Sequence, residues 1–173
     1  MSLFLVSARL PALAPGVLAS LAVLALLFAT PVLADRLQVT RAQGERIWHS
    51  AMPDGARWCV EWEHSVEHFT VRDCYLNVAG SMQLERSHQP DFAAGLGHTL
   101  GRGKQVSDGK GGYWIEEIYE PVPSNQYALR VGAMAVNHRL VWQQDGARHV
   151  YSLSRRAAGE RVWIQLVKTD EKH

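Results

Sequence analysis

Short runs in which apolar and polar residues alternate fill most of the chain after residue 34. The period of two is clearest at Tyr127, Leu129 and Val131. Strand-like segments of this kind lie at residues 37–39, 47–48, 57–64, 69–78, 82–84, 127–131, 140–142, 150–153 and 162–167. Turn residues such as Asp145-Gly146 separate them. Short strands joined by turns predict an all-β fold, either a single antiparallel β sandwich or a partly open barrel.

Residues 57–64 and 69–78 predict a β-hairpin with a defined register. When paired positions sum to 133, the aromatic residues share one side, and Glu61 faces Arg72 on the other. The same register sets Cys59 opposite Cys74. Directly opposed residues have Cα atoms about 5 Å apart, within reach of a disulfide. We therefore predict a disulfide between the only two cysteines.

Residues 1–34 have the pattern of a cleaved export signal. Arg9 is the only charged residue of this segment, Val17 to Ala29 are apolar apart from Ser20, and small residues precede a predicted cut after Ala34. The apolar run is shorter than the roughly 20 residues that span a bilayer. We expect a periplasmic or otherwise exported β domain at residues 35–173 that does not span the membrane. The alternative is an uncleaved N-terminal anchor with the domain facing the periplasm.

The charge balance of the predicted domain narrows the function classes. Residues 35–173 carry all 17 acidic residues and 17 of the 18 Lys and Arg, so their net charge is zero. A nucleic-acid-binding domain normally shows a basic excess, so none is predicted. A hydrophobic content of 47% and six Trp also argue against disorder.

The alternating pattern breaks between Asp91 and Gly112. Seven of these residues are Gly, which predicts one long loop. Glycine backbones can bind anions through their N–H groups, and the other interpretation is a loop that binds nothing. No phosphate-binding P-loop pattern occurs here, so no nucleotide cofactor is predicted.

His64-Ser65 suggests a hydrolase, but the predicted geometry argues against it. Neighbouring residues of a strand point to opposite faces, and Asp73 lies opposite Val60, roughly 13 Å along the hairpin from His64. No catalytic triad is therefore predicted. The spacing of His64 and His68 suits metal binding on a helix rather than on a hairpin, so no metal site is predicted either.

One stretch resembles a known bacterial family. The residues Trp62-Glu63-His64-Ser65-Val66-Glu67, followed by Val71, Asp73 and Tyr75 and later by Gly95-Leu96-Gly97, are similar to the domain of unknown function 1850 family. The resemblance covers about residues 58–142. It implies an exported accessory protein of a tripartite (TRAP) uptake system with a TAXI-family solute receptor, and no established activity. Its candidate binding or structural residues here are His64, Ser65, Glu67, Asp73, Gly95 and Gly97.

These observations lead to one principal hypothesis and two alternatives. The principal one is a non-enzymatic accessory protein, without a cofactor, whose partner is a transporter solute receptor or a membrane component. The first alternative is a small-ligand-binding module with an aromatic pocket capped by the Gly-rich segment. The less favoured alternative is a hydrolase that uses Ser65.

Overall fold

The computed structural model describes residues 34–66, 68–89 and 101–168, which belong to one compact unit. The strands are β1 (Arg36–Arg41), β2 (Arg46–Ala51), β3 (Arg57–Glu63), β4 (Thr70–Val78), β5 (Ser81–Gln89), β6 (Lys104–Ser107), β7 (Tyr113–Glu116), β8 (Glu120–Pro121), β9 (Gln126–Arg130), β10 (Arg139–Gln144), β11 (Ala147–Ser152) and β12 (Arg161–Val167). A 3-10 turn, η2 (Pro123–Asn125), and one short helix, α2 (Leu153–Ala157), complete the described elements. Within these ranges no helix is long and apolar enough to cross a bilayer.

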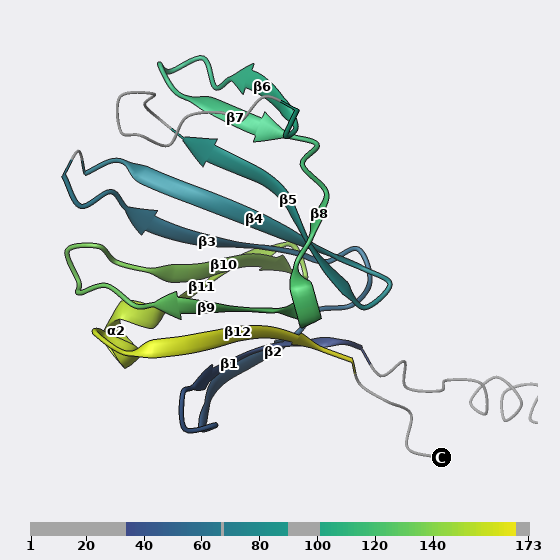
Figure 1. Ribbon diagram of the computed structural model, residues 1–173, viewed down its shortest axis with the longest axis vertical. Coiled ribbons are helices and arrows are strands. Elements are labelled where there is room, and N and C mark those ends of the chain that lie inside the picture. The colour runs from purple at the N-terminus through teal and green to yellow at the C-terminus, as the bar shows by residue number, and fades with distance from the viewer. Residues whose placement is uncertain (1–33, 67, 90–100, 169–173) are drawn as a thin grey trace, which may run out of the picture. The chain divides into compact units, whose positions relative to one another are not determined.

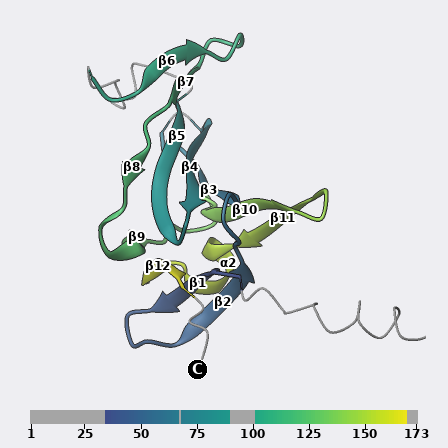
Figure 2. The same ribbon diagram turned by 90° about the vertical axis from the view of Figure 1, so that its right-hand side faces the viewer.

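The strands form two antiparallel sheets packed face to face, so the fold is an all-β sandwich of open sheets (Figure 1). The small sheet has the order β2-β1-β12-β9, and the large sheet the order β11-β10-β3-β4-β5-β7-β6, with β8 on β5. Figure 2 shows β6 and β7 at the end of the large sheet away from the small one. The prediction of an antiparallel sandwich is confirmed.

The hydrophobic core lies between the sheets and follows from the period of two. Leu37 and Val39 of β1 and Val162 and Ile164 of β12 are fully buried, while their neighbours in sequence face outward. From the large sheet, the fully buried Trp58 packs against them in the same cluster. Side chains that alternate in this way give each sheet one apolar face, and burying both faces drives the sheets together.

The hairpin of β3 and β4 has the predicted register. Cys59 pairs with Cys74, Trp58 with Tyr75, and Glu61 with Arg72. The two sulfurs form the predicted disulfide across a Cα–Cα distance of 4.0 Å. Each strand is one residue shorter at the turn than predicted, because His64 and Phe69 close the hairpin.

The single long loop predicted at residues 91–112 is wrong in its second half. Lys104–Ser107 form β6, which pairs with β7, whereas residues 91–100 lie outside the described residues. All four residues of β6 are exposed, so this edge strand carries no apolar alternation that sequence analysis could detect. Gly103 has a positive φ of 70°, and a Cβ there would collide with the Glu116 carbonyl oxygen. The glycine thus allows the chain to turn close to β7.

The strand predicted at residues 150–153 also ends earlier than expected. β11 stops at Ser152, whose hydroxyl accepts a hydrogen bond from the Arg155 backbone N–H and caps α2. Leu153 and Ala157 lie one helical turn apart and are both buried. Five residues are too few to show a helical period in the sequence.

Candidate functional site

A pocket of about 190 Å³ opens between the two sheets and is called the inter-sheet pocket below. One wall comes from β3 and β4 of the large sheet and the other from β9 of the small sheet. The pocket is lined by Val60, Trp62, Asp73, Tyr75, Tyr127, Leu129 and His138. Aromatic rings with a few convergent polar groups are the usual lining of a small-molecule site.

Asp73 is the acidic group of this pocket. It lies on β4 between Val71 and Tyr75, and the register with Val60 turns its side chain to the core face. Its Oδ1 accepts a hydrogen bond of 2.6 Å from the Ser87 hydroxyl, directly opposite on β5. Burial raises the pKa of Asp73 above its ordinary value, because the charged form loses hydration. The Ser87 hydrogen bond and the nearby charge of Arg102 oppose that shift.

Two stacked tyrosines form the aromatic side of the pocket. The rings of Tyr75 and Tyr127 lie 5.0 Å apart, and Trp58 stacks on the other side of Tyr75 at 5.8 Å. Burial raises the pKa of both tyrosines, and their hydroxyls therefore stay protonated. The buried Tyr127 hydroxyl interacts with the Tyr75 hydroxyl, and no other described residue bonds to it. Its oxygen can still accept a hydrogen bond from water or from a ligand.

His138 contributes a neutral imidazole. Its Nδ1 accepts a hydrogen bond of 2.9 Å from the Gly132 backbone N–H, so the ring proton of the neutral form is on Nε2. The Ser154 hydroxyl accepts the His138 backbone N–H and donates to the Gly132 carbonyl. Burial lowers the pKa of His138 below its ordinary value. The pocket therefore holds one carboxyl, two phenols and an imidazole N–H donor.

A smaller cavity of about 120 Å³ adjoins the inter-sheet pocket, with Tyr75 and Tyr127 lining both. Arg102 and Glu120 line this second cavity and form an ion pair of 2.8 Å with each other. Arg102 lies within the predicted Gly-rich loop of residues 91–112, two positions after the part outside the described residues. Its positive charge acts on Asp73 across the tyrosine pair.

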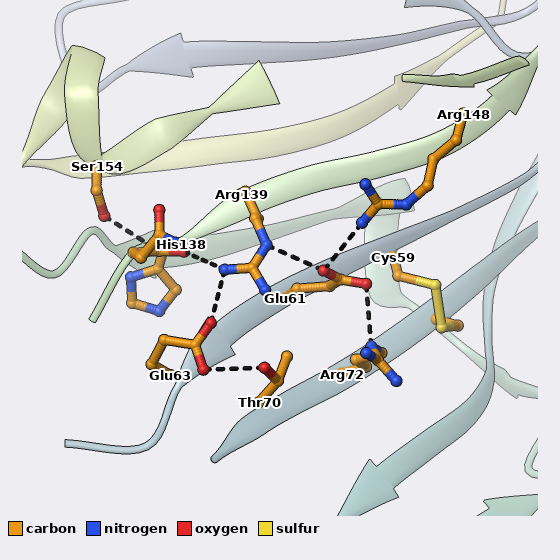
Figure 3. Close-up of polar contacts among 11 residues, drawn as sticks. Cys59, Glu61, Glu63, Thr70, Arg72, His138, Arg139, Arg148 and Ser154 are labelled. Carbon is orange, nitrogen blue, oxygen red and sulfur yellow. Dashed lines mark hydrogen bonds and ion pairs between the residues drawn. A yellow bond between two sulfur atoms is a disulfide. The ribbon is translucent and has the colours of Figure 1, made fainter. Parts of the chain in front are cut away.

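The opposite face of the large sheet carries a network of charged residues (Figure 3). Glu61 is only 5% exposed, and its oxygens accept hydrogen bonds of 3.0 Å from Arg72 and from Arg139, with Arg148 at 3.5 Å. Glu63 accepts from Arg139 at 2.8 Å and from Thr70 at 2.9 Å. Because the described oxygens and guanidinium groups already pair with one another, this network stabilises the outer face.

A groove of about 460 Å³ beside this network is larger than the inter-sheet pocket but more open. Arg155 and Arg156 of α2 line it, and both are exposed. Exposed arginines at the surface are well hydrated, so they bind an anion weakly. The buried polar groups converge instead on the inter-sheet pocket, which we take as the candidate site.

The candidate site residues predicted from the sequence lie in different parts of the structure. Asp73 lines the pocket, whereas His64 and Ser65 lie at the hairpin turn, where the His64 ring stacks on Phe69 at 5.0 Å. Ser65 is exposed, and Asp73 pairs with Val60 four residues from His64, as the register predicted. The remaining three candidates, Glu67, Gly95 and Gly97, lie outside the described residues.

The described histidines do not form clusters with other metal-binding side chains. His88 lies on β5 opposite Arg72 of β4 and hydrogen-bonds Asp108 through Nε2 at 2.8 Å. Asp108 also accepts the backbone N–H groups of Lys110 and Gly112, and these contacts lower its pKa, with the His88 bond as the largest cause. Among the described residues, no three His, Cys, Asp or Glu side chains lie close enough to share a metal ion.

The sequence did not identify Tyr127, His138 or Arg102 as site residues. Tyr127 was recognised as part of a strand, but its position depends on which sheet that strand joins. His138 lies just before β10, and the sequence around it contains no motif that marks it as a site residue; the nearest special residue is Gly132, six positions earlier. A Cβ on Gly132 would approach Val136 to 2.6 Å, so the loop requires glycine to place the histidine.

The chain belongs to a family of proteins that share a domain of unknown function (DUF1850), whose model matches residues 59–148. That range extends from β3 to β11 and contains every residue that lines the inter-sheet pocket. It also agrees with the resemblance seen at the H-S-V-E element. Comparison with curated proteins finds no match, and comparison with solved structures finds none.

Proposed function

We propose that the protein binds a small organic molecule in the inter-sheet pocket, without catalysing a reaction. The observation that carries this proposal is a partly buried carboxyl, Asp73, set among the rings of Trp62, Tyr75 and Tyr127. A buried ionisable group reduces stability unless something compensates it, so its presence in an aromatic pocket favours a binding role. The described residues that line the pocket include no Ser, Thr, Cys or Lys that could serve as a nucleophile.

Thermal denaturation with a panel of amino acids, organic acids and amines tests this function. A ligand that binds only the folded protein, present at about 100 times its Kd, adds about 2.7 kcal/mol to the free energy of unfolding. We expect at least one compound class to raise the Tm of the wild type by several degrees. Leu129→Trp, which fills the pocket, should abolish that rise.

Val150→Trp is the matched control, because Val150 is 47% exposed and lines the outer groove instead. This variant should keep the full ligand-induced rise in Tm. Loss of the rise in Val150→Trp but not in Leu129→Trp would move the site to the outer groove. A panel without any stabilising compound would remove the proposed binding function.

The proposed setting for this binding is a TRAP-type uptake system with a TAXI-family receptor, which the protein serves as an exported accessory component. The resemblance at His64, Ser65 and Glu67 and membership of the DUF1850 family support this setting. The partner surface that we propose is the hairpin turn, where Ser65 and Val66 are exposed. The Val66 side chain is 70% exposed and is available to a partner.

Co-purification from the native host tests the transporter role. We expect a solute receptor or a membrane component to co-purify with the wild type and less with His64→Ala, and uptake to fall in a deletion strain. The absence of a partner in both samples, together with unchanged uptake, would refute the role. The intact mass of the same preparation tests export, since a mass that includes residues 1–34 would leave the N-terminal anchor as the alternative.

A further inference from the structure

The polar groups of the inter-sheet pocket differ in what they can still bind. Asp73 uses Oδ1 to accept the Ser87 hydrogen bond, and no described residue donates a hydrogen bond to its Oδ2. The nearest cation that acts on it, Arg102, is paired with Glu120 in the adjoining cavity. The carboxylate therefore has an open oxygen and no ion-pair partner among the described residues.

The aromatic rings around this carboxylate are a second feature that favours a positively charged ligand. The faces of aromatic rings carry negative potential and attract organic cations, most strongly where water is excluded. Trp62, Tyr75 and Tyr127 line the same cavity of about 190 Å³ as the Asp73 carboxylate. The buried Tyr127 hydroxyl interacts with Tyr75, and its oxygen can also accept an N–H donor.

We infer that the ligand of the inter-sheet pocket carries an organic ammonium group, which donates to Asp73 Oδ2 and to the Tyr127 oxygen while its carbon chain packs on the rings. This inference rests on the proposed binding function and specifies its ligand class. An anion is disfavoured because it would face the Asp73 carboxylate at close range. A neutral alcohol would fill the space but would leave the carboxylate without a counter-charge.

The test uses three probes of nearly equal size: n-butylammonium, n-butanol and n-butyrate. Binding to the wild type is followed by NMR, from the shifts of the Trp62 indole N–H and of the Tyr75 and Tyr127 backbone N–H groups. We expect n-butylammonium to bind at least tenfold more tightly than either other probe. Equal or tighter binding of n-butanol or n-butyrate would overturn the inference and leave the proposed function intact.

Asp73→Asn is the decisive variant, because the amide keeps the shape and can still accept the Ser87 hydrogen bond. It should lose at least tenfold in n-butylammonium affinity while its n-butanol affinity stays within twofold. Asp145→Asn removes an equal charge from an exposed turn and should bind n-butylammonium like the wild type. An unchanged n-butylammonium affinity in Asp73→Asn would refute the assigned ion pair.

The thermal stability of Asp73→Asn shows whether this variant folds. The folded-state pKa of Asp73 is raised by burial, so the stability linked to this group is present at low pH and is lost as the pH rises through that pKa. Above the ordinary pKa of an aspartate this group therefore costs stability, and at pH 7 Asp73→Asn should melt no earlier than the wild type. If the wild type binds none of the three probes but binds a panel compound, the ammonium assignment fails and the binding function survives.

Discussion

Glu61→Gln is expected to lower the free energy of unfolding by about 3 kcal/mol at pH 7, although glutamine keeps the size of the side chain. The Glu61 carboxylate is buried and is shared by Arg72, Arg139 and Arg148. Without its charge, three guanidinium groups remain close together with less compensation. The estimate lies at the low end for a broken buried pair, because Arg72 and Arg148 still reach solvent. Urea denaturation measures the difference.

Glu63→Gln is the matched control for this prediction. Glu63 contacts Arg139 and Thr70 in the same network, but its side chain is 24% exposed. Solvent therefore compensates its loss, and we expect a cost of about 1 kcal/mol. If the two variants lose the same stability, burial of Glu61 is not what makes the network important.

Replacement of both cysteines in Cys59→Ala/Cys74→Ala should lower the free energy of unfolding by about 3 kcal/mol. The disulfide closes a loop across 15 positions of sequence, and the open chain regains that conformational freedom when unfolded. The sulfurs lie on the face of the hairpin that carries Glu61 and Arg72, away from Asp73. Neither cysteine lines the pocket, so the less stable variant should still bind its ligand, but more weakly because β3 and β4 are less restrained.

A reducing agent provides the control for the disulfide prediction. Reductant should bring the wild type close to the stability of the double variant and should leave the double variant unchanged. Equal sensitivity of both proteins to reductant would show that the loss has another origin. A double variant as stable as the oxidised wild type would show that the native sheet already restrains the hairpin fully.

The hairpin could be predicted from sequence because its evidence is local. One register aligned the two cysteines, paired Glu61 with Arg72 and gathered the aromatic residues on one face, and three independent patterns rarely agree by chance. The same register already placed Asp73 on the aromatic face, opposite Val60. The sequence analysis used this position only to separate Asp73 from His64, and the aromatic pocket around Asp73 became apparent only once the second sheet was in place.

The rest of the site could not be predicted, because it depends on long-range pairing. Tyr127 reaches the pocket only because β9 joins β12 in the small sheet, and nothing near Tyr127 specifies that partner. β6 was missed for a different reason, since its residues are exposed and its only apolar side chain is Val106. Edge strands of this kind gain their structure from backbone pairing rather than from an apolar pattern.

The disulfide and Asp73 lie on the same strand, β4, on opposite faces. The covalent link that fixes the outer face of β3 and β4 therefore also holds the floor of the pocket in place before any ligand arrives. A preorganised floor spares a ligand part of the entropy that ordering its site would otherwise cost. Oxidation of Cys59 and Cys74 during folding would then increase the affinity of the folded pocket for its ligand.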